Sequence, residues 1–496
     1  MKRRQFLAAG AAGTAGALFG CGGGDGGGGS GAMAGSPPPS TAALVEGQPL
    51  PALPGLHSTS VDPLQFTASL SAGPSQHELL PGAPAGLWLY NGTFPGPLIE
   101  LREGQRVSLR VDNRLPIDTT VHWHGLPVPP DQDGSPMDPI AAGGARIYTY
   151  EIPVGSAGTY WYHPHAHQTT ALQVARGLAA PLIVRGGDDP LSMLPEVTLF
   201  ISGVRLDGAG QVSPMSPVDA MVGRQGEALL VNGKRLPVHN VRAGATQRWR
   251  ILNATSAHYL RLSLEGHSLT LVGTDGGLLA APQPGQSEIL VAPAQRVEVV
   301  VRVSGTPNAR FRLRALRHAT DSMGFGVYAD DDLMTVQTSA ESPVAPIAIP
   351  ATLRALVDPG PATARQRLRL DQAGMGMGMG AGMGMLNFTI NGRTFDPARV
   401  DLTTQAGRIE EWDIVNGTMM DHPIHIHGTQ FQLLRRQSGA TITPAPFAAW
   451  LDTVDVPAGE SATIKVRQML PGKRMFHCHI LEHEDAGMMG ILDVAP

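Results

Sequence analysis

Residues 477–488 read HCHILEHEDAGM, and this stretch is the most informative segment of the chain. Side chains alternate between the two faces of a β-strand, so Cys478 and its two neighbouring histidines would point in opposite directions. One strand could then serve a metal on its thiolate side and a second metal group on its imidazole side. A thiolate, imidazoles and a weak axial methionine form a blue-copper electron-transfer site, and His483 and Met488 follow closely. A buried core thiol among ordinary core histidines would not explain so many metal-binding side chains within one short segment.

The overall composition narrows the class of protein. The chain has 496 residues, a net charge of −5, 61 glycines and 42 prolines, which favours short strands joined by turns. Its length predicts about three domains. The mildly acidic balance, without a basic stripe, predicts no nucleic-acid partner. Seventeen histidines and two cysteines exclude a disulfide framework and favour metal binding by imidazoles.

The N-terminal segment predicts export. Residues 1–20 carry paired arginines followed, one residue later, by Phe-Leu and a weakly apolar stretch, which resembles a bacterial twin-arginine signal. Cys21 lies where a lipoprotein would be cleaved and lipidated, and residues 22–40 are rich in Gly, Ser and Pro, as in a flexible tether. We therefore expect a periplasmic protein, either anchored to the membrane through Cys21 or cut at another site and soluble.

The rest of the chain contains a threefold repeat. Asn-Gly pairs begin at residues 91, 232 and 391; a glycine follows each pair, and an asparagine lies nine residues after that glycine. These positions are Gly104 and Asn113, Gly244 and Asn253, and Gly407 and Asn416. Apolar residues alternate between them, which predicts strands, and three copies predict three homologous all-β domains. The expected division is 1–57 for signal and tether, 58–187 and 188–345 for the first two domains, 346–385 for a linker with a Met/Gly-rich segment, and 386–496 for the third domain.

Two of the three copies carry paired histidines at matching offsets. One His-x-His pair lies nine residues past the repeat asparagine, and a second begins five residues past a later glycine. Period-two spacing places both imidazoles of a pair on one strand face, so four pairs from two domains could surround about three metals at a domain interface. The middle copy has leucines at the first offset, and is expected to be a scaffold without copper ligands. The pairs are His122 and His124, His163 and His165, His425 and His427, and His477 and His479.

These motifs resemble those of the multicopper oxidases, especially three-domain bacterial members of the copper-efflux (cuprous) oxidase type and laccases. The resemblance rests on HWHG at 122–125, YHPH at 162–165, HPIHIHG at 422–428 and residues 477–489. It implies three cupredoxin-like Greek-key β-barrel or sandwich domains. It also implies an enzyme that couples four one-electron oxidations of a substrate to the reduction of dioxygen to water.

The resemblance further implies four copper ions and a role for each matching residue. The type 1 copper would be bound by His422, Cys478 and His483 with Met488 axial, the type 2 copper by His122 and His425, one type 3 copper by His124, His163 and His479, and the other by His165, His427 and His477. The family also places proton-relay carboxylates at the positions of Asp133 and Glu484. The alternatives are that Asp133 is a turn residue and Glu484 a solvated surface acid.

The expected substrate follows from a methionine-rich run. Residues 374–385 contain Met375, Met377, Met379, Met383 and Met385 among glycines, and thioether sulfur selects Cu(I). Cuprous oxidases carry such a segment over the type 1 site, and their substrate-copper site implies Met420 as a further ligand. The aspartate of that site does not carry over, because Thr418 occupies its position, and Asp421 is at best a displaced substitute. We therefore predict a monomeric cuprous oxidase acting in copper tolerance, with dioxygen and Cu(I) as its partners.

Two other functions remain open at this stage. The chain could be a laccase-like oxidase of small phenols or aromatic amines, with the methionine run serving only as a lid or low-complexity linker. It could also be a non-catalytic copper-binding or envelope scaffold. The scaffold is disfavoured because such relatives lose ligand histidines, whereas this chain keeps all ten together with Cys478 and Met488.

Overall fold

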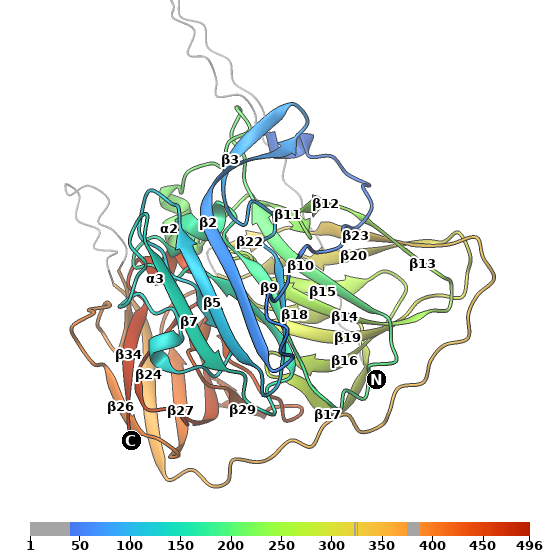
Figure 1. The fold of residues 1–496 in the computed structure, drawn as a ribbon. Coiled ribbons are helices and arrows are strands. Elements are labelled where there is room, and N and C mark those ends of the chain that lie inside the picture. Colours follow the sequence, from blue (N-terminus) through green and yellow to red (C-terminus); the bar gives the residue numbers. More distant parts are fainter. Residues whose placement is uncertain (1–39, 322–323, 325, 374–386) are drawn as a thin grey trace, which may run out of the picture. The chain divides into compact units, whose positions relative to one another are not determined.

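The structure, a computed structural model, describes residues 40–321, 324, 326–373 and 387–496 (Figure 1). β-Strands dominate these residues, and each repeat forms two principal sheets that share one hydrophobic core. The all-β class predicted from the sequence is therefore confirmed. Among the described residues no helix is long and apolar enough to cross a membrane.

The first domain packs a four-stranded sheet on a five-stranded sheet. The first sheet has the order β3 (Ala83–Tyr90), β2 (Gln65–Leu80), β5 (Arg106–Asn113) and β7 (Ala145–Glu151). The second has the order β1 (Gly55–Leu56), β4 (Leu98–Arg102), β9 (Ala180–Arg185), β8 (Gly158–His163) and β6 (His122–His124). Short helices are η1 (Ser40–Ala43), η2 (Pro130–Gln132) and α1 (Thr170–Ala175).

The middle domain is built on a larger sheet. That sheet runs β12 (Lys234–Arg235), β11 (Ala228–Val231), β10 (Glu196–Val204), β14 (Thr246–Asn253), β19 (Arg296–Arg302), β16 (Leu269–Thr274) and β17 (Gly277–Gln286). It packs on β13 (Val238–Val241), β23 (Asp331–Thr338), β20 (Arg310–Leu316), β15 (Leu260–Leu264) and β18 (Ile289–Val291). A small ribbon, β21 (His318–Ala319) with β22 (Val327–Tyr328), and helix α2 (Pro217–Val222) complete it.

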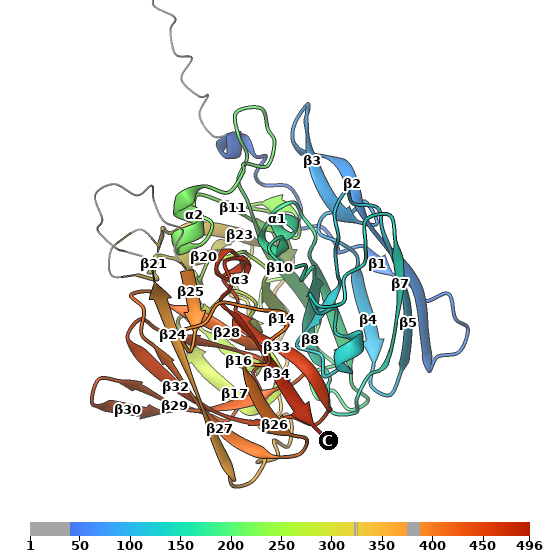
Figure 2. The ribbon, with the colours of Figure 1, turned by 90° about the vertical axis from the view of Figure 1, so that its left-hand side faces the viewer.

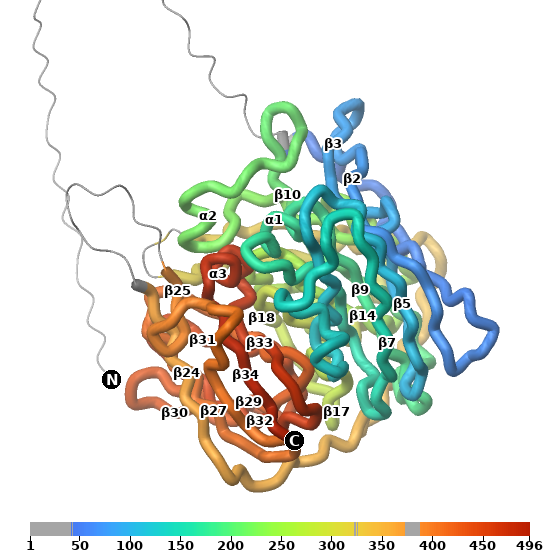
Figure 3. The backbone as a smooth tube through the Cα atoms, turned by 60° about the vertical axis from the view of Figure 1, so that its left-hand side comes forward, coloured from blue at the N-terminus to red at the C-terminus, as the bar shows by residue number. Residues whose placement is uncertain are grey.

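The third domain carries the predicted Cys478 centre and two of the four His-x-His pairs. Its first sheet runs β25 (Asn387–Ile390), β24 (Ala364–Ala373), β27 (Ile409–Asn416), β32 (Glu460–Arg467), β29 (Phe431–Ser438) and β30 (Thr441–Pro444). Its second runs β26 (Leu402–Gln405), β34 (Met489–Ala495), β33 (Gly472–Cys478), β28 (His422–Ile426) and β31 (Thr453–Val456). Helix α3 (Leu481–Asp485) contacts α1 and α2, and the three short helices cluster in Figures 2 and 3.

The repeat predicted from the sequence has a structural basis in all three domains. Each Asn-Gly pair has two successive positive φ angles, for example 50° and 69° at Asn91 and Gly92, the conformation of a tight hairpin turn. The three repeat asparagines are buried, and the side-chain amide of each donates to carbonyls of two separate segments. Each also accepts a hydrogen bond from the backbone N–H two residues later. One buried amide thus fixes the entry to the following strand in every domain.

Two expected domain boundaries differ from the structure. Strand β24 lies within the expected linker 346–385 but pairs in parallel with β27, so the third domain begins before residue 386. Leu368 and Leu370 are buried on one face of β24 and alternate with arginines, because this segment supplies an inner strand of the sheet. The end of the expected tether also packs on the fold: Leu44 is buried and β1 pairs with β4. The signal, Cys21 and the methionine run lie outside the described residues.

Candidate metal centre

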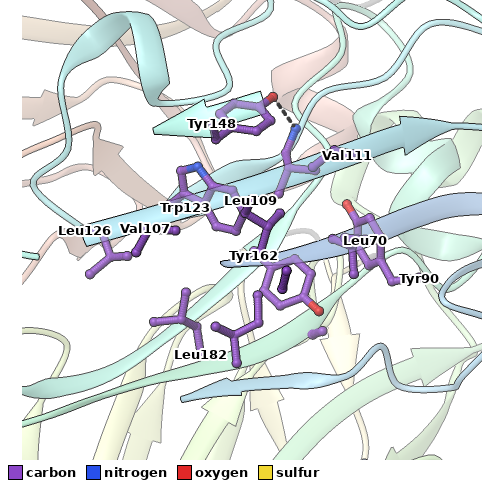
Figure 4. Close-up of a cluster of buried hydrophobic side chains, with 14 of the residues drawn as sticks. Leu70, Tyr90, Val107, Leu109, Val111, Trp123, Leu126, Tyr148, Tyr162 and Leu182 are labelled. Carbon is purple, nitrogen blue, oxygen red and sulfur yellow. Dashed lines mark hydrogen bonds between the residues drawn. The ribbon is translucent and has the colours of Figure 1, made fainter. Parts of the chain in front are cut away.

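The first-domain histidines are placed by a strand whose opposite face is buried in the core. Trp123, between His122 and His124 on β6, packs edge-on against Tyr148 with ring centroids 5.4 Å apart, and lies 5.8 Å from Tyr162 (Figure 4). The indole ring is fully buried, so the strand cannot rotate without opening this core. The two histidines consequently face away from the core, toward the other domains.

Strand pairing aligns the second set of histidines with the first. In the first domain His122 lies opposite His163 across the β6–β8 pair. In the third domain His425 lies opposite His477 across the β28–β33 pair. The same register in both domains brings the four predicted pairs to one place.

The eight predicted histidines form one buried cluster, and none of them is exposed to solvent. His427 Nε2 and His165 Nε2 lie 3.0 and 3.1 Å from His477 Nε2. His124 Nδ1 lies 3.4 Å from His163 Nε2. Groups of three ligand atoms within 4.8 Å of one another include His165 with His427 and His477. This group coincides with one ligand set implied by the resemblance, whereas the other groups within the cluster combine histidines from different implied sets.

The cluster has the donor chemistry of a metal site. Nε2 of His122, Nε2 of His425 and both ring nitrogens of His479 are buried without a hydrogen-bond partner among the described residues. Leaving such groups unpaired costs about 1–3 kcal/mol each unless something else binds them. Burial, followed by neighbouring imidazoles, lowers the pKa of His124 and His163, which keeps them in the neutral, metal-binding form. The residues present therefore fit a bound metal cluster.

A second centre lies on the opposite face of β33. Cys478 Sγ is 3.4 Å from His422 Nδ1 and 3.8 Å from His483 Nδ1, and all three residues are fully buried. Met488 is also fully buried, and its backbone carbonyl accepts from the Cys478 N–H at 3.1 Å. Burial raises the pKa of the Cys478 thiol, so a metal must displace its proton on binding. The alternating faces of β33 separate this centre from the histidine cluster by a few backbone bonds.

The surroundings of the second centre hold its two imidazoles in place. Thr418 Oγ1 lies 2.8 Å from His422 Nε2, and the carbonyl of Met221 lies 3.2 Å from His483 Nε2. The buried ring of Phe388 stacks on His483 with centroids 3.8 Å apart. Both Nδ1 atoms are thereby directed at the sulfur. Thr418 occupies the position where the resemblance predicts an aspartate, and it contacts the histidine directly.

Both predicted carboxylates lie against the histidine cluster. Asp133 Oδ2 accepts a hydrogen bond from His427 Nδ1 at 2.7 Å, and its backbone carbonyl accepts from His122 Nδ1 at 2.9 Å. Glu484 lies 3.2 Å from His477 Nδ1 and 3.5 Å from His165 Nδ1. Both side chains are buried, so neither the surface-acid alternative for Glu484 nor a simple turn role for Asp133 agrees with the structure.

Burial alone would raise the pKa of Glu484. The charges of His165 and His477 and a hydrogen bond from His477 outweigh burial and hold that pKa at about 2. The group is therefore an ionised acceptor beside two cluster imidazoles. A carboxylate in this position fixes the tautomer of the ring that it contacts.

Several important residues were not predicted from the sequence. Asp452 contacts His124 and His425, and Arg296 of the middle domain forms an ion pair with it. Phe388 was also missed, since it lies outside every motif. The described candidate for a substrate-copper ligand, Met420, is buried in the core of the third domain. Met375, Met377, Met379, Met383 and Met385 lie outside the described residues.

A buried cluster of eight imidazoles is joined by one strand to a Cys/His/Met centre, and the donor set of that second centre is the one that copper prefers. Multicopper oxidase family models match residues 72–189, 159–330 and 366–496. The chain belongs to the multicopper oxidase family. It is therefore an oxidase that uses dioxygen and binds copper.

Individual relatives match most of the chain. The multicopper oxidase Mco of Staphylococcus aureus is 31% identical over 420 residues, covering 82% of this chain and 83% of the relative. The laccase of Bacillus subtilis strain 168 is 30% identical over 484 residues, covering 84% and 91%. The solved structure of the multicopper oxidase from Campylobacter jejuni, described as a metallo-oxidase, has a TM-score of 0.86 at 38% identity and covers 92% of this chain and 97% of that chain.

Proposed function

We propose that this oxidase acts on Cu(I) in copper tolerance and binds four copper ions. His422, Cys478, His483 and Met488 would hold the type 1 copper, and His122 and His425 the type 2 copper. The two type 3 coppers would be held by His124, His163 and His479, and by His165, His427 and His477. Bound copper would supply the one-electron redox chemistry that joins substrate oxidation to the reduction of dioxygen to water.

The chain's own residues contribute a connection and two proton-handling groups. Cys478 is covalently linked to His477 and His479, so the two centres share a short backbone path. The ionised Glu484 lies beside His477 Nδ1, where it can accept a proton transiently, and Asp133 Oδ1 has no hydrogen-bond partner among the described residues. A carboxylate with a free oxygen next to a buried site can accept and pass on a proton.

The observation that carries the Cu(I) assignment is the attachment of the methionine run beside the type 1 residues. Ala373 pairs with Asn387 across β24 and β25, so the run begins and ends at one edge of this sheet. The next residue, Phe388, stacks on His483. The last of the five thioethers, Met385, stands three residues before this phenylalanine in the sequence. Thioethers prefer Cu(I) to harder ions.

A polar pair near His422 also supports a cationic substrate. His318 Nε2 lies 3.5 Å from Asp421 Oδ2, directly beside His422 in the chain. These side chains are 18% and 12% exposed, so both reach the surface. The description of the Campylobacter relative as a metallo-oxidase agrees with this proposal.

A laccase is the second candidate, because the Bacillus relative of similar identity carries that name. Oxygen uptake by the copper-loaded protein separates the two functions, with Cu(I) or a simple methoxyphenol as reductant and with or without added Cu(II). The proposal predicts rapid uptake with Cu(I), and phenol turnover only when Cu(II) is added. Brisk phenol oxidation without added Cu(II), together with slow Cu(I) oxidation, would establish a laccase instead.

A matched variant tests the methionine run itself. Replacing its five methionines by leucine keeps the length and apolar character but removes the sulfur. We expect this variant to lose Cu(I) oxidation while keeping its turnover of phenols, and deletion of 375–385 to do the same. Equal loss on both substrates would contradict a Cu(I)-specific role.

We also propose export to the periplasm through the twin-arginine-like segment of residues 1–20, with Cys21 as the point of lipid attachment. An exported oxidase would meet copper before it reaches the cytoplasm. Cell fractionation of the full chain and of Cys21→Ala tests this placement. Release of only the variant into the soluble periplasmic fraction would support the anchor, and equal release of both proteins would contradict it.

A further inference from the structure

Asp133 and Asp452 hold the histidine cluster in a reciprocal way. The backbone carbonyl of Asp133 accepts from His122 of its own domain, while its carboxylate accepts from His427 of the third domain at 2.7 Å. The backbone contact of Asp133 thus goes to the first histidine of the His-x-His pair in its own domain. The carboxylate contact goes to the second histidine of the other domain's pair.

Asp452 repeats this arrangement from the other side. Its backbone carbonyl accepts from His425 Nδ1 at 2.8 Å, and its carboxylate Oδ1 accepts from His124 Nε2 at 3.1 Å. The nitrogens left to face the cluster are His425 Nε2, which has no hydrogen-bond partner among the described residues, and His124 Nδ1, which faces His163. Asp452 therefore decides which nitrogen each of these two rings presents.

The two aspartates differ in what holds them. Asp133 keeps one oxygen without a hydrogen bond, whereas both oxygens of Asp452 accept from the guanidinium of Arg296. Arg296 belongs to β19 of the middle domain and is fully buried. A bidentate pair of this kind fixes the plane of the carboxylate as well as its charge.

Arg296 is itself fixed by all three domains. Its Nε donates to the carbonyl of Thr159 in the first domain at 2.9 Å, and its Nη2 donates to the carbonyl of Asp275 in the middle domain at 3.0 Å. The carboxylate of Asp275 accepts from the backbone N–H of Arg296 at 2.8 Å and from that of Asp452 at 3.2 Å. The middle domain thus holds both the side chain and the backbone of Asp452.

The glycine that follows the first histidine pair reflects this close packing. A Cβ added to Gly125 would lie 2.2 Å from Asp452 Oδ2 and 2.7 Å from Arg296 Nη2. Gly125 also has a φ of +84°, which side chains rarely adopt. Any larger residue there would push the ion pair away from His124.

We propose that Arg296 and Asp452 are positioning residues of the copper cluster, and that the middle domain, without a ligand of its own, sets the orientation of His124 and His425 through them. This inference rests on the eight-histidine copper cluster of the proposed function. Partners that orient metal-binding histidines change metal affinity by roughly ten- to a hundredfold when they are removed. The middle domain, expected from its sequence to be a scaffold without copper ligands, would thus also orient ligands of the other two domains.

The test compares two buried arginines of the middle domain in the full chain. Arg296→Met removes the partner of Asp452. Arg250→Met is the matched control, because Arg250 is equally buried and paired, with Glu298, and donates to the Thr159 hydroxyl, but contacts no cluster histidine. Copper per chain, the type 2 resonance signal in EPR, and the blue absorption of the Cys478 centre are measured for both.

We expect Arg296→Met to bind copper at the histidine cluster roughly ten- to a hundredfold more weakly and to alter the type 2 signal. The blue absorption should remain, since Cys478 lies on the other face of β33. Arg250→Met should lower the melting temperature but keep full copper. Arg296→Lys should recover only part of the affinity, because an ammonium ion lacks the bidentate fork.

Equal copper loss in both methionine variants would overturn the proposal, as would full copper with an unchanged EPR signal in Arg296→Met. If Arg296→Met does not fold, Asp452→Asn and Gly125→Ala perturb the same contacts and must show the same selective loss. A wild-type protein that binds copper only at the Cys478 centre would instead refute the copper set of the proposed function. None of these measurements depends on whether the wild-type protein prefers Cu(I) or phenols as its substrate.

Discussion

A prediction that the structure makes quantitative concerns Glu298, which lies fully buried between Arg248 and Arg250. Burial alone would raise its pKa, but the two arginines and a hydrogen bond from Thr159 outweigh burial and lower it from 4.5 to about 2. A depressed carboxylate pKa stabilises the fold above the unfolded value and loses that contribution as the pH falls through the folded value. Linkage converts this difference into about 3 kcal/mol at neutral pH.

Glu298→Gln keeps the shape of the side chain and removes its charge, so two buried arginines lose their counterion. At pH 7 we expect a loss of about 3–5 kcal/mol of unfolding free energy. As the pH falls from 5 toward 2, the wild-type glutamate becomes protonated and the gap between the two proteins should shrink. Urea unfolding of the copper-free proteins at pH 7, 5 and 3 measures that gap without interference from copper release.

Glu227→Gln provides a control of opposite sign. Glu227 is buried beside Arg224, but burial dominates and raises its pKa. A raised carboxylate pKa costs stability as the pH rises through it, so the glutamine variant should gain relative to wild type between pH 3 and pH 7. A Glu298→Gln gap that stays constant, or widens on acidification, would show that the arginines do not hold an ionised Glu298.

Three further outcomes follow from the copper centres. Cys478→Ser should abolish the absorption at about 600 nm and steady-state oxidase activity while circular dichroism stays native, and a retained blue band would exclude Cys478 as the ligand. Asp133→Asn should lower turnover by about a hundredfold. It should keep the blue band and at least the Cys478-centre copper, and an unchanged rate would remove Asp133 from proton handling. Chelation of copper should lower the melting temperature, by an amount equivalent to about 4 kcal/mol for metal present at a thousand times its dissociation constant, and calorimetry with copper restored checks the reversal.

Much of the histidine cluster could be predicted from the sequence, because the spacing patterns that identify its residues lie within short segments. Period-two spacing on a strand and constant offsets from Asn113 and Asn416 are properties of short segments. The structure adds the reason for these offsets, since each repeat asparagine joins separate segments of its own domain by hydrogen bonds. Strand β24 could also have been predicted, because leucines and arginines alternate along it. The neighbouring methionine run was instead assigned with it to a linker, which placed the expected start of the third domain too late in the chain.

The positioning network could not be predicted in this way. Asp452 is 328 residues from His124 and 156 residues from Arg296, and no motif precedes it. Such contacts depend on how whole domains meet, and a single sequence carries no spacing that encodes them. Phe388 was missed for a related reason, since its contact with His483 arises only when β25 adds to the edge of its sheet.

The equal division of the cluster histidines between the first and third domains has a consequence for assembly. Neither domain holds more than half of the ligands, so tight copper binding requires both halves to be docked in the correct orientation. The free energy of metal binding then also stabilises the docking of the two domains, so that bound copper holds the first and third domains together. Cleavage of the chain between the domains would leave fragments whose reassociation depends on copper. Loss of copper would first weaken the interface between the first and third domains, before either domain unfolds.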